Sequence, residues 1–349
     1  MRSLLPLGLA LAAALAGAAR AQPASPFPLD RFLTQHAHVS DRDLAGLARG
    51  TPIVRTLAAG DPKEIVVAGA IRMGIPARFY VEQFRDIVRM KRSEDVLQIG
   101  KFGNPPSADD AAALRLDHDD VEALRKCRPE DCDIRVTGAM LDRVRTGMDW
   151  TARDLDARAS QRFQHALAER AAAFLRDGDR ALGRFVARDT ADAAAAFTAV
   201  LKRTPWLQES APDAHDYLAR FPQAPLAGAD QFVYWSKEVW GPARVVTLTH
   251  VTIAPRVSTA AGEEFLILTR DVYATHLLDA SLGVVIVSDR GDADRPACDV
   301  AYVNHSRAPA LQGFLGGLRR SLVQRRQRDA MDRSLRALKE RLEAAYRGR

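Results

Sequence analysis

The sequence lacks the short motifs that mark common enzyme classes. It contains no Gly-x-Ser-x-Gly nucleophile elbow, no glycine-rich phosphate loop ending in Lys-Ser or Lys-Thr, and no His-Glu-x-x-His zinc motif. The residues that could bind a metal lack further ligands close by in the sequence. His36 and His38 fall in a polar stretch, and the acidic run Asp117–Asp120 lacks the glycine and the spacing of a calcium loop. We therefore expect no metal or cofactor and assign no catalytic residue.

Long apolar segments are missing beyond the N-terminus, so no transmembrane helix is expected after residue 21. At the N-terminus, Arg2 precedes an apolar run, Leu4–Ala18, of about 15 residues, which is shorter than a spanning helix. Ala19 and Ala21 then supply the small residues of a signal-peptidase site. We predict a signal peptide, residues 1–21, cleaved after Ala21, and a periplasmic or secreted protein. An uncleaved N-terminal anchor is the alternative.

Cysteine is scarce, with three residues in 349. Cys127 and Cys132 bracket a short loop that contains Pro129. In an oxidising compartment this spacing favours a local disulfide, Cys127–Cys132, over a redox pair, which usually has two intervening residues. Cys298 lies in an apolar strand pattern, which predicts a buried free thiol.

Positive charge is concentrated at one end of the chain. Residues 317–349 contain 11 Arg or Lys and 4 Asp or Glu, whereas the chain from residue 22 to residue 316 is slightly acidic. An exported chain of this kind is not expected to bind nucleic acid. The basic segment is most simply a solvated helix face, but peripheral contact with an anionic membrane, or with a partner helix, is also open. The sequence assigns no oligomeric state.

Hydrophobic periodicity predicts both strands and helices. A continuous apolar run predicts a strand at 64–73, and short strands are also expected at 96–102 and 133–136. From Gln231 a period of two predicts strands at 232–239, 244–254, 264–276, 281–288 and 297–304. The short connections between the last five indicate an antiparallel sheet. Helices are expected from Pro76 to about Met90, in an Ala-rich stretch over 151–201, and from Pro309 to the C-terminus.

The order of these elements resembles the START-like, or helix-grip, superfamily over residues 64–102 and 231–346. That resemblance implies an α+β fold in which a curved antiparallel sheet grips a long C-terminal helix and leaves an apolar cavity between them. Residues 22–62 would be a polar lead-in, and residues 64–346 the START-like domain. Residues 103–230 depart from a minimal member of the superfamily, as a helical insertion or as a separate helical subdomain.

Three short segments also resemble a group of exported bacterial proteins. They are Tyr234-Trp235-Ser236-Lys237-Glu238, Tyr273-Ala274-Thr275-His276 and Asn304-His305-Ser306-Arg307. This second resemblance implies export but no particular activity.

Polar side chains inside apolar strands point to candidate ligand contacts, because such groups are costly unless they are paired or face water or a ligand. Alternation places Arg270 and His276 on one face of their strand, and Asp271 and Tyr273 on the other. We select four groups to orient a ligand: His250, Tyr273, His276 and Arg307. For each of them a satisfied structural role is the alternative, such as an ion pair or helix capping at the end of the last strand.

The leading hypothesis is non-catalytic binding of a hydrophobic or amphipathic small molecule, with a lipid as one candidate, in a cavity between sheet and helix. One alternative is a hydrolase- or cyclase-like enzyme that uses His250 or His276 as a base, since histidine titrates near neutral pH. Another is a structural envelope protein with a filled core. Two titratable groups within hydrogen-bond reach in the cavity would favour the enzyme, and a sheet packed solid against the helix would favour the structural role.

Overall fold

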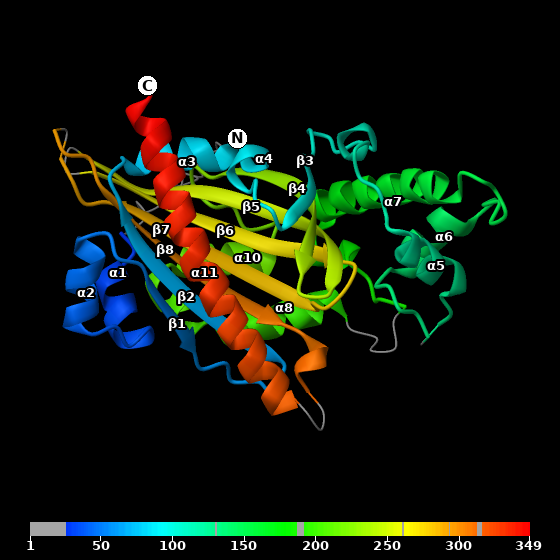
Figure 1. Cartoon of the computed structure of the whole chain (residues 1–349), viewed down its shortest axis with the longest axis horizontal. Helices are drawn as coiled ribbons and strands as arrows, with labels where there is room; N and C mark the ends of the chain where they lie inside the picture. Colours follow the sequence, from blue (N-terminus) through cyan, green and yellow to red (C-terminus); the bar gives the residue numbers. More distant parts are fainter. Residues whose placement is uncertain (1–25, 130, 187–191, 260–261, 293, 313–315) are drawn as a thin grey trace, which may run out of the picture.

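The computed structural model describes residues 26–349 except 130, 187–191, 260–261, 293 and 313–315. The predicted signal peptide, residues 1–21, lies outside the described residues. An antiparallel sheet of eight strands, in the order β1-β2-β8-β7-β6-β5-β4-β3, forms the centre of the fold (Figure 1). The strands are β1 (Ile53–Leu57), β2 (Glu64–Met73), β3 (Val96–Lys101), β4 (Asp230–Trp240), β5 (Ala243–Thr259), β6 (Gly262–Ala274), β7 (Ala280–Asp289) and β8 (Cys298–Arg307).

The helices lie before, between and after these strands. The α-helices are α1 (Leu29–Arg31), α2 (Asp41–Ala48), α3 (Ala77–Arg85), α4 (Ile87–Met90), α5 (His118–Lys126), α6 (Gly138–Arg145), α7 (Leu155–Asp177), α8 (Ala193–Lys202), α9 (Pro205–Ser210), α10 (Pro212–Arg220) and α11 (Gly316–Arg347). Short π or 3-10 turns are η1 (Phe32–His36), η2 (Asp109–Ala111), η3 (Gly178–Ala181) and η4 (Pro309–Leu311). No helix of the described residues combines the length and the apolarity needed to cross a bilayer.

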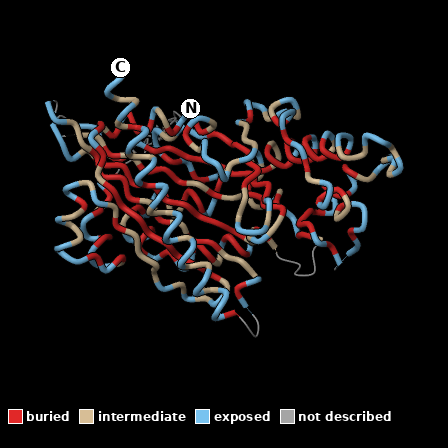
Figure 2. The backbone as a smooth tube through the Cα atoms, in the orientation of Figure 1, coloured by how far each residue is buried: buried red, intermediate tan, exposed pale blue. Residues whose placement is uncertain are grey.

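Both faces of the sheet carry apolar side chains that pack against helices, because successive side chains of a strand point to opposite sides. On one side, which we call the α11 face, Ile71 and Ile267 pack with side chains of α3, α4 and α11. On the other side, the α7 face, Ala70 and Leu268 pack with side chains of α7, α8 and α10. Figure 2 shows the result as nearly continuous burial along the central strands.

The long helix α11 lies along β2 on the α11 face. A Cβ atom placed on Gly69 would come within 2.6 Å of the Met331 sulfur and 2.9 Å of a Leu335 methyl group, so the missing side chain lets the helix approach the strand closely. At the far end of the helix, the Gly74 amide donates a hydrogen bond of 2.7 Å to Glu343. A curved antiparallel sheet with a long C-terminal helix laid across it is consistent with a helix-grip fold.

Residues 103–230 form most of the layer on the α7 face. Phe163, Phe174, Val200 and Trp206 from this segment belong to the same apolar cluster as Leu268 of the sheet. Their side chains are almost completely buried, so this helical layer and the sheet share one core.

The predicted α+β architecture is confirmed, including the antiparallel pairing of the last five strands and the long terminal helix. The structure also contains the Cys127–Cys132 disulfide and a buried, free Cys298 at the start of β8. The disulfide is compatible with an exported protein.

Two expectations about strands need correction. The strand predicted at residues 133–136 is wrong: after the disulfide loop, Arg135 donates its amide to Thr275 and Val136 accepts from Val186, and neither bond extends into a ladder. In addition, β1 pairs with β2 at the edge of the sheet, within a stretch where no strand was predicted. The alternation of apolar and polar residues in β1 is short and follows Pro52 directly, so it gives little evidence of a strand on its own.

Candidate functional site

His250 and Tyr273 both lie on the α7 face, beneath the helical layer. His250 is 3% exposed, and its Nε2 atom is 2.8 Å from Gln231 Oε1. Its ring packs between Phe174 and Phe221, with centroids 5.4 and 4.6 Å away. Burial, with a contribution from Arg270, lowers the pKa of His250 to about 3. A neutral, enclosed imidazole of this kind is poorly placed to exchange protons near pH 7.

Removing the buried imidazole is expected to change acid stability. A histidine whose folded-state pKa is depressed stabilises the fold above its unfolded pKa of about 6.5, and this stability is lost as the pH falls from there toward 3. His250→Gln should therefore reduce the loss of unfolding free energy between pH 7 and pH 5 by about 2 kcal/mol. Urea denaturation at both pH values measures this difference, and an unchanged pH dependence in the variant would contradict it.

Tyr273 is held by side chains of the helical layer. Its hydroxyl donates a 2.5 Å hydrogen bond to the Arg135 carbonyl, and the Arg170 guanidinium lies 5.4 Å from the ring centroid. The rings of Phe163 and Phe185 flank it at 6.2 and 6.1 Å. Burial raises the pKa of the Tyr273 phenol.

The expectation that Asp271 and Tyr273 share a face is wrong. The register between β5 and β6 shifts after Leu248, which pairs with Tyr273, while Thr249 pairs with Asp271. The extra residue, Val272, is a β-bulge, and a bulge reverses the alternation of every residue that follows it. Tyr273 therefore points to the α7 face and Asp271 to the α11 face.

His276 and Arg307 lie at the same end of the sheet, where β6 and β8 finish, each beside acidic partners. His276 lies in the turn after β6, and its Nε2 atom is 2.8 Å from Oδ1 of Asp120 in α5. Arg307, at the end of β8, donates hydrogen bonds of 2.8 Å to both Asp61 and Glu64. The four residues selected from the sequence are thus not gathered around one space, and a ligand role for them stays a prediction.

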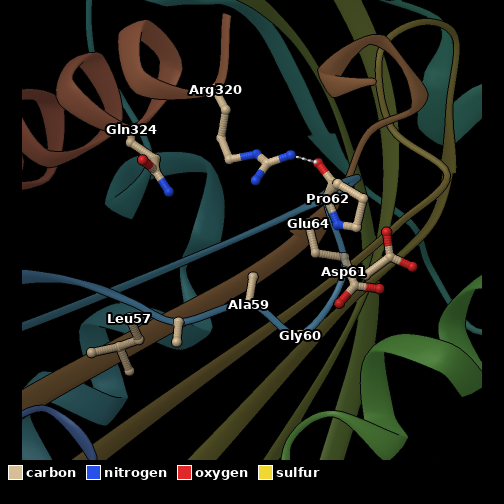
Figure 3. Close-up of a pocket in the computed structure, with 9 residues that line it drawn as sticks. Leu57, Ala59, Gly60, Asp61, Pro62, Glu64, Arg320 and Gln324 are labelled. Carbon is tan, nitrogen blue, oxygen red and sulfur yellow. Dashed lines mark hydrogen bonds between the residues drawn. The ribbon is translucent and has the colours of Figure 1, made fainter. Parts of the chain in front are cut away.

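A hollow of about 290 Å³ opens beside Asp61 and Glu64, the two carboxylates that pair with Arg307 (Figure 3). It is lined by the chain between Leu57 and Glu64 and by Arg320 and Gln324 of α11. Arg320 reaches down from the helix and donates a 2.7 Å hydrogen bond to the Pro62 carbonyl. A second hollow, of about 480 Å³, lies where residues 26–31 meet the start of β6. Both are at the margins of the sheet.

A further group of polar side chains lies away from both hollows, in the middle of the α11 face. We call it the Asp271 cluster, and it consists of Thr249, Asp271, Ser281, Tyr302 and Asn304. Thr249 donates a 2.7 Å hydrogen bond to Asp271, and Asn304 donates a 3.1 Å hydrogen bond to Ser281. Asp271, Tyr302 and Asn304 are only partly buried, so the cluster reaches solvent at its centre.

Strand pairing explains how these residues come together. Thr249 lies directly opposite Asp271, and Asn304 lies opposite Gly283 on β7. Gly283 has a specific role, because a Cβ atom there would collide with the Thr269 hydroxyl and come within 3.1 Å of the Tyr302 ring. The missing side chain lets Thr269 and Tyr302 lie across β7 toward each other.

Asp271 is the titratable group at the centre of the cluster. Its surroundings exclude most water, and this desolvation raises the pKa of Asp271 to about 6, although the hydroxyls of Thr249 and Ser281 and the charge of Lys91 oppose the shift. Burial similarly raises the pKa of Tyr302 to about 12. The cluster therefore holds a carboxyl group that changes charge just below neutral pH and a phenol that keeps its proton.

Further polar side chains extend the cluster toward β4. Lys91, just beyond α4, forms a 2.7 Å ion pair with Glu238, and its Nζ atom is 3.5 Å from the Tyr234 hydroxyl. The Ser236 hydroxyl is 3.0 Å from that of Thr247. Polar groups therefore continue across the α11 face from β8 to β4, with apolar side chains on either side of them.

Helix α11 contributes to the same side of the sheet. Met331 faces β2, so Gln327, one turn earlier, also points toward the sheet. Its Oε1 atom is buried without a hydrogen-bond partner among the described residues. Arg326 extends to the β4–β5 turn, where a Cβ atom on Gly241 would lie 3.7 Å from its Nη1 atom. The helix and the hairpin thus approach each other above the sheet.

Sequence reasoning missed most of the Asp271 cluster, although a signal was present. Four strands that are consecutive in the sheet carry small or polar residues two positions apart, which places each pair on one face. These pairs are Thr247 and Thr249, Thr269 and Asp271, Ser281 and Gly283, and Tyr302 and Asn304. Aligning them requires the strand register and the bulge.

No group of three His, Cys, Asp or Glu side chains in the described part of the chain is arranged to hold a metal ion. Comparison of the sequence with protein-family models, with curated proteins and with solved structures gave no match.

Proposed function

We propose that the protein binds an amphipathic small molecule on the α11 face, with the polar end of the ligand on the Asp271 cluster. The observation that carries this proposal is a partly exposed carboxyl, phenol and carboxamide at the centre of a sheet face that is apolar on either side of these polar groups. Ligand sites typically place a few convergent polar groups of this kind within an apolar surround. Partly buried Met331 and Leu338 of α11 offer adjacent apolar surface.

The fold and the disulfide are consistent with this proposal. A sheet that grips a helix supports membership of the START-like superfamily, in which a ligand lies between these two elements. The Cys127–Cys132 disulfide supports export to the periplasm or the exterior. In this proposal His250 and Tyr273 stabilise the fold, because both are enclosed on the opposite face.

The polar lining sets the ligand class. When ionised, Asp271 can accept hydrogen bonds or pair with a cation, and when protonated it can donate a hydrogen bond. Tyr302 adds a hydroxyl donor, and Asn304 adds an amide that both donates and accepts. An amine, hydroxyl or amide head group on an apolar tail matches this set. The histidine-based enzyme is less well supported, because His250, His276 and His305 all have partners away from the Asp271 cluster.

A titration with dodecylamine, kept below its aggregation concentration, tests the proposal. The cationic head should bind more tightly as Asp271 ionises, so affinity should rise about tenfold from pH 5 to pH 7. Asp271→Asn should remove that rise and weaken binding at pH 7 about tenfold or more. Isothermal titration calorimetry reports both quantities.

Two further variants sharpen the experiment. Gly283→Val displaces Thr269 and Tyr302 without touching Asp271 and should also weaken binding. Glu340→Gln removes an exposed carboxylate of α11 and is the matched control, which should bind as the unmodified protein does. Equal affinity in the Asp271→Asn variant, or no binding of dodecylamine at any pH together with no co-purifying molecule in native mass spectrometry, would rule the proposal out.

A further inference from the structure

The first half of α11 presents exposed leucines among arginines. Leu318 is 71% exposed and Leu322 is 48% exposed. They are four residues apart and therefore adjacent on one side of the helix. Arg319, Arg325 and Arg326 surround them and are also exposed. We call these five residues the Leu318 patch.

The patch faces away from the sheet. Gln324 and Met331, which lie on the opposite side of the helix, point toward β2 and the hollow at its start. Over the whole of α11, the buried positions are Gly316, Leu335 and Leu342, and Figure 2 shows the outer side exposed along its length. The two leucines therefore contribute little to the core and leave apolar surface on the outer side of the helix.

The charges of the first half are unbalanced, in contrast to those of the second half. Residues 316–328 contain five arginines and no acidic residue. No ion pair involves the arginines of the Leu318 patch within the described residues, whereas Arg336 pairs with Asp332 and Lys339 with Glu343 farther along the helix. The patch thus carries unpaired positive charge, whereas two of the basic residues farther along the helix are paired with acidic neighbours.

We propose that the Leu318 patch docks the protein on an anionic phospholipid surface. Arginines complement lipid phosphates, and leucines between them can insert at the level of the acyl chains. Charge alone would fit an acidic protein or a nucleic acid equally well, but exposed leucines at the centre of the positive patch favour a lipid interface. The docking proposal stands on the surface of α11 and is independent of the Asp271 cluster.

Vesicle co-sedimentation of the folded protein tests this docking. Vesicles of phosphatidylglycerol and phosphatidylcholine in equal parts should bind the protein, and vesicles of phosphatidylcholine alone should not. Binding should fall steeply in about 0.5 M salt, because salt screens surface charges. Leu318→Ser combined with Leu322→Ser, and separately Arg325→Gln combined with Arg326→Gln, should each weaken binding about tenfold or more.

A matched control removes the same charge farther along α11. Arg333→Gln combined with Arg336→Gln should weaken binding no more than about threefold. Equal losses in the two arginine pairs would show attraction by net charge and overturn a defined patch. Binding to neither vesicle would overturn the proposal outright. A dimer in light scattering that is lost with the leucine substitutions, without lipid binding, would assign the patch to contact between copies of the chain.

Discussion

Replacing Glu64 by glutamine is expected to lower the free energy of unfolding by about 3 kcal/mol. The Glu64 side chain is completely buried at the start of β2 and accepts hydrogen bonds from Arg307 at 2.8 Å and Arg203 at 2.9 Å. His305 Nε2 lies 3.0 Å from its second oxygen. Removing the charge leaves Asp61 as the remaining carboxylate that both guanidinium groups contact. Since Arg203 is 35% exposed, we expect a loss at the lower end of the range for broken buried ion pairs.

Urea denaturation at pH 7 measures the effect of Glu64→Gln. Glu340→Gln is the matched control, because it makes the same chemical change at an exposed position of α11 and should alter stability by less than about 0.5 kcal/mol. A loss below about 1 kcal/mol for Glu64→Gln would mean that the buried charges are better solvated than the structure implies. The experiment also concerns Arg307, which the sequence suggested as a ligand group, since its guanidinium is held by Glu64 and Asp61.

Tyr273→Ala is expected to lower the free energy of unfolding by about 4 kcal/mol. The ring is 2% exposed and packed among Phe163, Phe185 and Arg170, so truncation leaves a large cavity. Tyr273→Phe keeps the ring and should lower stability by only about 1 kcal/mol, the cost of leaving the Arg135 carbonyl without its donor.

Tyr302→Phe provides the comparison from the other face of the sheet. Tyr302 is partly exposed in the Asp271 cluster, so loss of its hydroxyl should change stability by less than about 0.5 kcal/mol and should weaken dodecylamine binding instead. If Tyr273→Phe abolished dodecylamine binding while Tyr302→Phe left it intact, the ligand would lie on the α7 face, and the original selection of Tyr273 would be supported.

Polar residues on the two faces of the sheet show why the candidate site was hard to predict. The four residues selected from the sequence are polar groups in or beside apolar strands, and that criterion finds a satisfied buried group as readily as a ligand contact. His250 is satisfied by Gln231 of the neighbouring strand β4, and Tyr273 by the Arg135 carbonyl of the helical layer, which is distant in sequence. The polar residues of the Asp271 cluster met the same criterion, but their convergence depends on the pairing of β5, β6, β7 and β8.

Local signals were sufficient for the order of elements. Alternating apolar residues, turn residues between strands and the apolar stripe after Pro309 predicted the last five strands, their antiparallel connections and the terminal helix. The spacing of Cys127 and Cys132 predicted their disulfide, because a loop that short brings the two residues together without help from the rest of the fold. These features depend on interactions between residues that are near in sequence, so the sequence by itself determined them.

Tertiary structure alone decided which face each polar residue occupies. One bulge residue, Val272, sends Asp271 and Tyr273 to opposite sides, and no local pattern marks that position. The pairing of β2 with β8 joins Glu64 to Arg307 across most of the chain, and α11 is placed along β2 by contacts at Gly69. These outcomes depend on packing between residues far apart in the sequence, where a shift of one position in register reverses the direction of every side chain that follows.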